Sequence, residues 1–229
     1  ADDVHHPRTR LICLENTHNR KGGEPLSGAY TAAVSEIATR RGLKLHLDGA
    51  RIFNASVALG EDVRRLTAPA DSVSFCLSKG LGAPVGSLLC GSGAFIRGAR
   101  RIRKQLGGGM RQAGVIAAAG IVALTTMVDR LADDHRRARR LASSLAALPG
   151  IVLEAERPAS NMIFFQLHES AGLEAAQLED GLRARDVLIH PVGHRRVRLV
   201  LHHDIDDEDL ERALEAFSEA LGASGRRRS

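Results

Sequence analysis

The sequence has few aromatic residues, few cysteines and no long apolar run. Aromatic side chains make up only 3% of its 229 residues, so the net charge of +5 is not accompanied by stacking residues of the kind that bind nucleic acid. No apolar run approaches the length of a membrane span, and the start lacks the basic and apolar regions of a signal peptide. We therefore expect a cytoplasmic protein with neither a nucleic-acid nor a membrane partner.

The three cysteines exclude a disulfide framework. Cys13, Cys76 and Cys90 are odd in number and lie inside apolar, strand-like runs without the spacing of metal ligands. We expect three reduced thiols in the core and no metal site. The chain also begins without methionine and reaches a strand-like run at residues 11–14 almost at once, so we expect that an N-terminal portion is missing.

Strand-like and helix-like patterns alternate over the first 91 residues. Apolar runs at 11–14, 43–48, 72–77 and 86–91 are separated by a helical pattern after Ser27 and a second one after Gly49. This order predicts an α/β fold with a mainly parallel sheet and helices on both faces. Asp48 ends one strand and Lys79 follows the next, so both should lie at the carboxyl edge of the sheet, where ligands bind.

The second half of the chain changes character. A basic helix is expected over residues 94–104 and a long helical region over 110–148, whose first part, 115–122, is apolar enough to be buried. From residue 151, short strands alternate with helices, and Gly222 should stop the last helix. We expect a partial large domain over 1–148, a small α+β domain over 149–222 and a basic flexible tail over 223–229.

Lys79 is the residue that most needs an explanation. Its own stretch, an apolar run entering a Gly/Pro loop, suits a solvated turn lysine and a reactive amine equally well. A pyridoxal phosphate enzyme needs a lysine for the Schiff base and a carboxylate at the pyridine nitrogen. Lys79 and Asp48 supply both types of side chain on successive strands.

Five segments carry a family resemblance: ENTHN at 15–19, LHLDGARIFNA at 45–55, CLSKGLGAPVGS at 76–87, GGGMRQ at 107–112 and VRLV at 197–200. In order and spacing they resemble the low-specificity L-threonine aldolases. The resemblance implies the fold type I, aspartate aminotransferase-like fold, pyridoxal 5'-phosphate as cofactor, and a homodimer or homotetramer with shared sites. It also implies retro-aldol cleavage of L-threonine or L-allo-threonine to glycine and acetaldehyde.

The resemblance assigns a role to each matching residue. Lys79 resembles the Schiff-base lysine and Asp48 the partner of the pyridine nitrogen. Arg51 resembles the arginine near the cofactor O3' and the substrate carboxylate, and Arg198 a second arginine that binds this carboxylate. Arg111 resembles the residue that reaches the cofactor phosphate of a neighbouring subunit.

Three further side chains have less settled roles. Lys104 either assists in binding the phosphate or is an ordinary solvated lysine. His5 and His18 are both candidates for taking the β-hydroxyl proton or for holding a water that does so, with His5 the first choice. His46 is expected to be a packed histidine.

Two other functions remain open from the sequence. A related β-eliminating lyase could use the same lysine and aspartate to break a different bond. Alternatively, an inactive fragment could act only through contacts with another chain. The resemblance places the phosphate loop in the missing first third, so a chain that truly starts at Ala1 should bind the cofactor weakly and show little activity.

Overall fold

The computed structural model describes residues 3–226, and backbone contacts divide the chain into two units. The first unit comprises the described residues up to Thr17 together with Pro25–Asp129, and the second comprises His18–Glu24 together with the residues from Arg130 onward. The sequence places the boundary after residue 148, whereas the backbone contacts place it after Asp129. The helix 131–146 accounts for the difference, because its apolar side chains belong to the core of the second unit.

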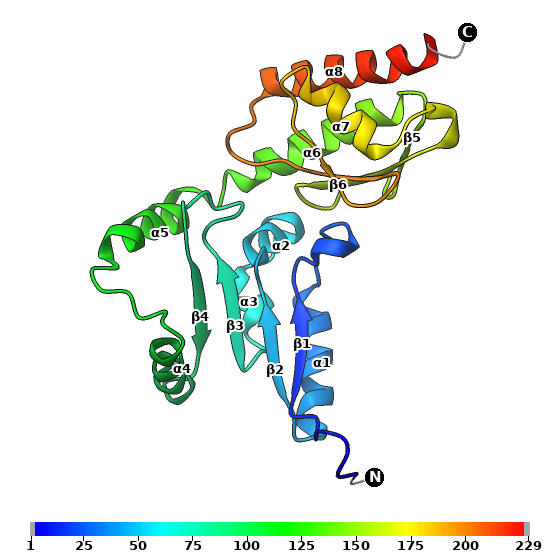
Figure 1. The fold of residues 1–229 in the computed structure, drawn as a ribbon. Helices are drawn as coiled ribbons and strands as arrows, with labels where there is room; N and C mark the ends of the chain where they lie inside the picture. Colours follow the sequence, from blue (N-terminus) through cyan, green and yellow to red (C-terminus); the bar gives the residue numbers. More distant parts are fainter. Residues whose placement is uncertain (1–2, 227–229) are drawn as a thin grey trace. The chain divides into compact units, whose positions relative to one another are not determined.

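The first unit is built on a four-stranded sheet (Figure 1). Its strands are β1 (Leu11–Glu15), β2 (Lys44–Asp48), β3 (Ser72–Cys76) and β4 (Ser87–Gly91), in that spatial order. β1, β2 and β3 run parallel, and β4 runs antiparallel to β3. This topology confirms the mainly parallel sheet expected from the sequence.

Five helices belong to the described part of this unit: α1 (Gly28–Arg40), α2 (Ile52–Leu59), α3 (Val63–Thr67), α4 (Gly93–Gln105) and α5 (Gly114–Thr126). Ser27 begins α1 by accepting a hydrogen bond from the Tyr30 amide at 3.2 Å. The core cluster joins Leu47 of β2 and Val73 of β3 to α2 and α3. These contacts bury one face of the sheet and so fix β2 and β3, which carry the candidate site.

The cysteines are not core residues, contrary to the prediction. Cys13 and Cys90 are exposed and Cys76 is half-buried, and all three are free thiols. The apolar runs around them alternate between the two faces of the sheet. The covered face takes residues such as Leu14 and Phe75, while Cys13 and Cys76 point to the other side.

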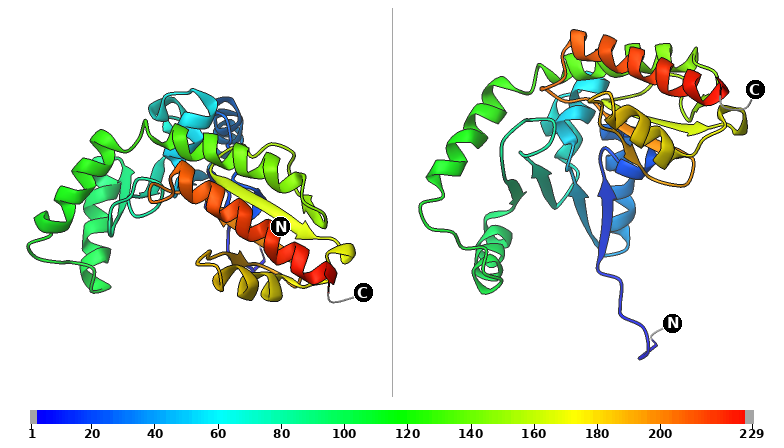
Figure 2. Two further views of the ribbon diagram at one scale, coloured as in Figure 1. Left: turned by 90° about the horizontal axis from the view of Figure 1, so that it is seen from above. Right: turned by 45° about the horizontal axis from the view of Figure 1, so that its top comes forward.

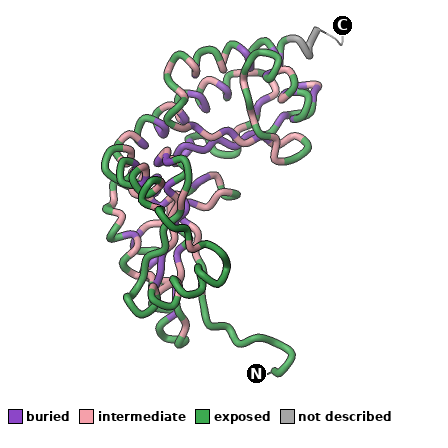
Figure 3. The backbone as a smooth tube through the Cα atoms, turned by 60° about the vertical axis from the view of Figure 1, so that its left-hand side comes forward, coloured by how far each residue is buried: buried purple, intermediate pink, exposed green. Residues whose placement is uncertain are grey.

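The apolar helix α5 also differs from its prediction. Val115, Ile121 and Val122 are 80%, 64% and 56% exposed, although residues 115–122 were expected to be buried (Figure 3). Within α5 only Gly120 and Ala123 are buried. The expected long helix is moreover two helices, since α5 ends at Thr126 and the next helix begins at Leu131.

The second unit packs three helices against an antiparallel sheet. Its strands β5 (Ile151–Leu153), β6 (Met162–Leu167), β8 (Arg196–Val200) and β7 (His190–Pro191) are neighbours in that order. Its helices are α6 (Leu131–Ala146), α7 (Ala175–Arg183) and α8 (Asp207–Arg226), with short 3-10 turns η1 (Asn19–Lys21) and η2 (Glu169–Ala171). α6 and α8 lie side by side (Figure 2), joined by ion pairs such as Arg137–Asp207.

The core of this unit explains why α6 belongs to it. Leu141 and Leu145 of α6 join Phe165 of β6 and Phe217 of α8 in one buried cluster. The two phenyl rings meet edge to face with centroids 6.1 Å apart. α8 continues past Gly222 to Arg226, so the expected tail is helical over residues 223–226, and residues 227–229 lie outside the described part.

No single helix among residues 3–226 is long and apolar enough to cross a membrane; only α5 and α6 taken together, across the break between them, meet the criteria of length and composition.

Candidate active site

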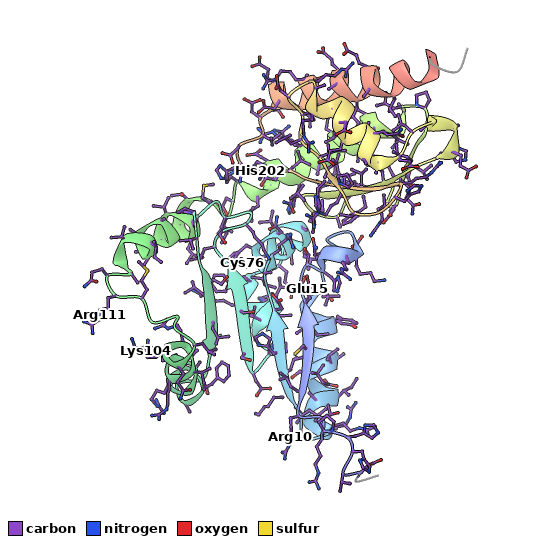
Figure 4. The ribbon with its side chains drawn as sticks, viewed as in Figure 1. Arg10, Glu15, Cys76, Lys104, Arg111 and His202 are labelled. Carbon is purple, nitrogen blue, oxygen red and sulfur yellow. The ribbon has the colours of Figure 1, made fainter. Side chains whose placement is uncertain are left out.

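Asp48 and Lys79 come together at one edge of the first sheet. Asp48 is the last residue of β2 and pairs in register with Glu15, the last residue of β1. Lys79 follows Cys76, the last residue of β3, which runs parallel to β2. Figure 4 shows Glu15 and Cys76 at the same end of the sheet and Arg10 at the other. The two candidate residues therefore share the carboxyl edge, as expected from the sequence.

The turn after β2 holds the Asp48 carboxylate. Its Oδ1 accepts a hydrogen bond from the Ala50 amide at 3.0 Å, while its carbonyl oxygen accepts one from the Asn16 amide at 2.8 Å. Gly49 fits tightly, because a Cβ there would lie 3.0 Å from the Ser74 carbonyl oxygen. Asp48 remains exposed, so its second oxygen can reach a ligand.

Lys79 lies on a short loop that is anchored on both sides. Leu77, Leu81 and Ala83 are buried, and the Ala83 amide donates to the Leu77 carbonyl oxygen at 3.0 Å. The Lys79 carbonyl oxygen accepts from the Gly82 amide at 2.9 Å, which closes the turn. Lys79 itself is exposed, so a fixed backbone presents an accessible amine.

Arg51 is the third candidate at this edge. It occupies the N-cap position of α2, three residues after Asp48, and is half-buried. An arginine at the start of the helix that follows β2 is positioned by the same turn that holds Asp48.

Lys104 and Arg111 are the two basic candidates away from this edge of the sheet. Lys104 lies in the last turn of α4, and Arg111 lies on the segment that leads to α5 (Figure 4). Gly109 lies directly against the Lys104 stem, because a Cβ at Gly109 would be 2.7 Å from Lys104 Cδ. Both cations are exposed, so the pair is open to a phosphate from outside this unit. Figure 4 places both of them away from Cys76, the last residue of β3.

The three histidines occupy different environments. His5 is exposed and precedes Arg10, which Figure 4 places at the end of the sheet opposite Cys76. His18 follows the carboxyl end of β1 by three residues and caps η1, with Nδ1 accepting from the Arg20 amide at 3.2 Å. A neutral imidazole with that bond carries its proton on Nε2. His46 is packed as expected, with Nδ1 2.8 Å from Ser72 Oγ.

Two arginines of β8 lie on the same face of the second sheet but differ in their partners. Arg196 makes a two-pronged ion pair with Glu154 at 2.6 and 2.7 Å and stacks 4.6 Å from the Phe164 ring centroid. This ion pair lowers the pKa of Glu154. Arg198 instead donates from Nη1 to Asn19 Oδ1 at 2.9 Å, and its buried Nε has no hydrogen-bond partner among the described residues. Of these two arginines, only Arg196 has a carboxylate partner among the described residues.

Asn19 is the hydrogen-bond partner of the candidate residue Arg198, and the sequence reasoning did not single it out. It belongs to the ENTHN segment, which was used only for the resemblance and for His18. The side-chain oxygen of an asparagine can accept a hydrogen bond from an arginine and leave the arginine charged. In a sequence, such an asparagine looks the same as an ordinary asparagine of a turn.

Comparison with known proteins identifies the family. The model of the β-eliminating lyases matches residues 1–170. The chain belongs to the β-eliminating lyase family. Within it, the chain is 48% identical over 216 residues to low-specificity L-threonine aldolase 1 of Arabidopsis thaliana, covering 94% of this chain and 60% of that protein. It is 46% identical over 211 residues to the low specificity L-threonine aldolase of Escherichia coli K12, covering 91% and 60%.

Solved structures agree on the fold. The threonine aldolase of Leishmania major superimposes on this β-eliminating lyase family member with a TM-score of 0.75 at 21% identity, covering 96% of this chain and 63% of that one. A PLP-dependent aminotransferase from Streptococcus suis gives 0.71 at 20% identity, covering 94% and 58%. These neighbours confirm the expected fold class. The chain spans about three-fifths of the length of the curated relatives above.

Proposed function

We propose that this chain carries the catalytic residues of an enzyme that cleaves β-hydroxy-α-amino acids, such as L-threonine and L-allo-threonine, to glycine and an aldehyde. The observation that carries the proposal is the pairing of Asp48 and Lys79 at the carboxyl edge of parallel strands, in a member of the β-eliminating lyase family. The relatives named as low-specificity L-threonine aldolases support this choice of substrate.

The residues at this edge fit pyridoxal 5'-phosphate. The exposed amine of Lys79 would hold the cofactor covalently, and Asp48, with one oxygen bonded to Ala50, would pair its other oxygen with the pyridine nitrogen. When bound, this cofactor withdraws electrons from the Cα of an attached amino acid. Arg111 and Lys104 are the cations proposed to bind a phosphate, in keeping with their exposure and their position away from Cys76.

The substrate needs a carboxylate partner and a group for its β-hydroxyl. Arg51 and Arg198 are proposed to bind the carboxylate, since a guanidinium offers paired donors in one plane. The orientation of the carboxylate decides which bond of Cα breaks. His18 is preferred over His5 for the β-hydroxyl, because His18 follows the carboxyl end of β1 whereas His5 precedes its amino end. We propose that His18 takes part in the removal of the β-hydroxyl proton, directly or through a water.

Covalent attachment of the cofactor tests the role of Lys79. The purified chain is mixed with pyridoxal phosphate, reduced with borohydride, digested and analysed by mass spectrometry. We expect the added mass on the peptide that contains Lys79, and no specific addition in Lys79→Ala. Lys21→Ala removes an equally exposed lysine of η1 and is the matched control, which should label normally. Labelling spread evenly over surface lysines would contradict the assignment.

Self-association is proposed as a dimer or tetramer. The support is the exposure of Val115, Ile121 and Val122 on α5, because apolar side chains of one helix are rarely left in water. Light scattering should give a mass above 24.5 kDa, and Val122→Lys with Ile121→Lys should lower this mass. A monomer at all concentrations would contradict self-association.

We propose the cytoplasm as the location of the protein. The support is that all three cysteines are free thiols, which suits a reducing compartment.

A further inference from the structure

We propose that Asn19 is a positioning residue, which orients Arg198 for the substrate carboxylate while leaving the guanidinium fully charged. The inference rests on the proposed function, because it gives Arg198 a carboxylate to bind. It concerns a residue that acts through Arg198 and has no assigned contact with the substrate.

The hydrogen bond between these side chains joins distant parts of the sequence. Arg198 Nη1 donates to Asn19 Oδ1 at 2.9 Å, across a separation of 179 residues. Both residues are half-buried. A bond at this distance fixes one end of the planar guanidinium and therefore the direction of its remaining donors.

The segment that carries Asn19 is itself firmly placed. Asn19 is the first residue of η1, which ends at Gly22 in a left-handed conformation with φ of +74°. The next residue, Gly23, accepts a buried hydrogen bond on its carbonyl oxygen from Ser160 Oγ at 2.9 Å. A Cβ at Gly23 would lie 2.5 Å from the same Ser160 Oγ, so the backbone here packs closely against the connection between β5 and β6 of the same unit. The backbone that follows Asn19 is thus held in place, so Asn19 can act as a fixed acceptor.

Arg198 is also constrained by its own strand. It is the middle residue of β8, with Phe164 of β6 opposite it on one side and His190 of β7 on the other. Its Nε is buried and has no hydrogen-bond partner among the described residues. A buried N–H without an acceptor is unfavourable, so this donor favours binding of an acceptor from a ligand.

The comparison with Arg196 indicates why the partner is an amide. Arg196 lies two residues earlier on the same face and is neutralised by the Glu154 carboxylate through two short bonds. An aspartate at position 19 would do the same to Arg198 and would compete with a substrate carboxylate. The asparagine oxygen orients the guanidinium as an aspartate would, but adds no negative charge.

The first experiment measures KM and kcat for L-threonine with the chain loaded with pyridoxal phosphate. We expect Asn19→Asp and Asn19→Ala each to raise KM about tenfold or more, with a much smaller change in kcat. This is the loss of affinity expected when a hydrogen bond to a charged group is removed. Gln166→Ala removes an exposed amide from the same face of the sheet and should leave both constants unchanged. Circular dichroism checks that each variant folds.

A second measurement does not depend on turnover. The Nε–Hε resonance of Arg198, assigned by its loss in Arg198→Lys, is followed by ¹⁵N NMR while glycine is added. We expect glycine to shift this resonance in the starting protein and much less in Asn19→Asp, whose carboxylate already occupies the guanidinium. Asn19→Ala should broaden the resonance before any glycine is added, because the guanidinium loses its fixed acceptor.

The outcomes separate the two claims. Unchanged KM and unchanged NMR response in both Asn19 variants, with a raised KM in Arg198→Lys, would overturn the positioning role and leave the proposed function standing. An Arg198→Lys variant with normal KM, or a starting protein whose Arg198 resonance ignores glycine, would overturn the carboxylate role of Arg198 and the inference with it. A fall in kcat alone in the Asn19 variants would also contradict positioning of a binding group.

Discussion

The buried His135 predicts an acid-sensitive second unit. His135 of α6 is 1% exposed, and burial, with a smaller effect of the Arg139 charge, lowers its pKa from 6.5 to about 4. The folded protein therefore holds the imidazole in its neutral form, whereas the unfolded chain protonates it near the usual value. The resulting contribution to stability is complete above the unfolded pKa and is lost as the pH falls toward the folded pKa.

The size of the effect follows from the two pKa values. A fall from 6.5 to about 4 corresponds to about 3 kcal/mol when both states are fully titrated. At about pH 5 the folded state is still mostly neutral while the unfolded state is protonated, so roughly 2 kcal/mol is lost relative to about pH 8. Burial raises the pKa of Asp134 despite its ion pair with Arg130, so Asp134 changes stability with pH in the opposite direction. Its contribution is the same in the starting protein and in a variant of His135, and therefore cancels when the two are compared.

The assay is urea unfolding, followed by circular dichroism, at these two pH values. The His135→Gln variant keeps a polar side chain that cannot be protonated, so its loss of stability on acidification should be smaller than that of the starting protein by roughly 2 kcal/mol. His190→Gln, an exposed histidine of β7, should behave like the starting protein. Equal acid losses in the starting protein and in His135→Gln would refute the reasoning.

Two further predictions concern local backbone geometry and helix ends. Gly150→Ala should destabilise the second unit strongly, because φ is +85° and the new Cβ would lie 2.6 Å from the Ala171 Cβ. Gly42→Ala is the control: φ is +64° but the space around it is open, so the free energy of unfolding should fall by only about 1–2 kcal/mol. Urea unfolding of both variants checks this, and equal losses would show that the contact with Ala171 is unimportant. Glu61→Gln should cost about 0.5–1 kcal/mol and reduce the salt dependence of stability, because the Glu61 carboxylate accepts from the first amide of α1 at 3.3 Å. Glu36→Gln, exposed on the same helix, is the control, and a similar loss there would contradict a specific role for the helix end.

The sequence predicted the order and direction of the first strands better than their burial. Alternating strand and helix patterns indicate a parallel sheet because a crossover helix must connect parallel strands, and this rule holds for β1, β2 and β3. Burial of Cys13 and Val115 was predicted wrongly, because an apolar residue type indicates that contact with apolar surface is favourable but not which element supplies it.

The candidate site was predictable where it depends on strand ends. Asp48 and Lys79 could be placed at one edge from their positions after two parallel strands, without knowledge of any side-chain contact. The bond between Asn19 and Arg198 could not be predicted, since it depends on how a short turn lies on a strand 179 residues away.

Product analysis with L-threonine and L-allo-threonine is the most direct test of the proposed reaction. The chain is incubated with pyridoxal phosphate and each amino acid, and glycine, acetaldehyde, ammonium ion and keto acid are quantified, in parallel with Lys79→Ala. The account predicts glycine and acetaldehyde in equal amounts, with both lost in Lys79→Ala. Ammonium ion and a keto acid without glycine would contradict aldol cleavage, and undiminished glycine release by Lys79→Ala would contradict the role of Lys79.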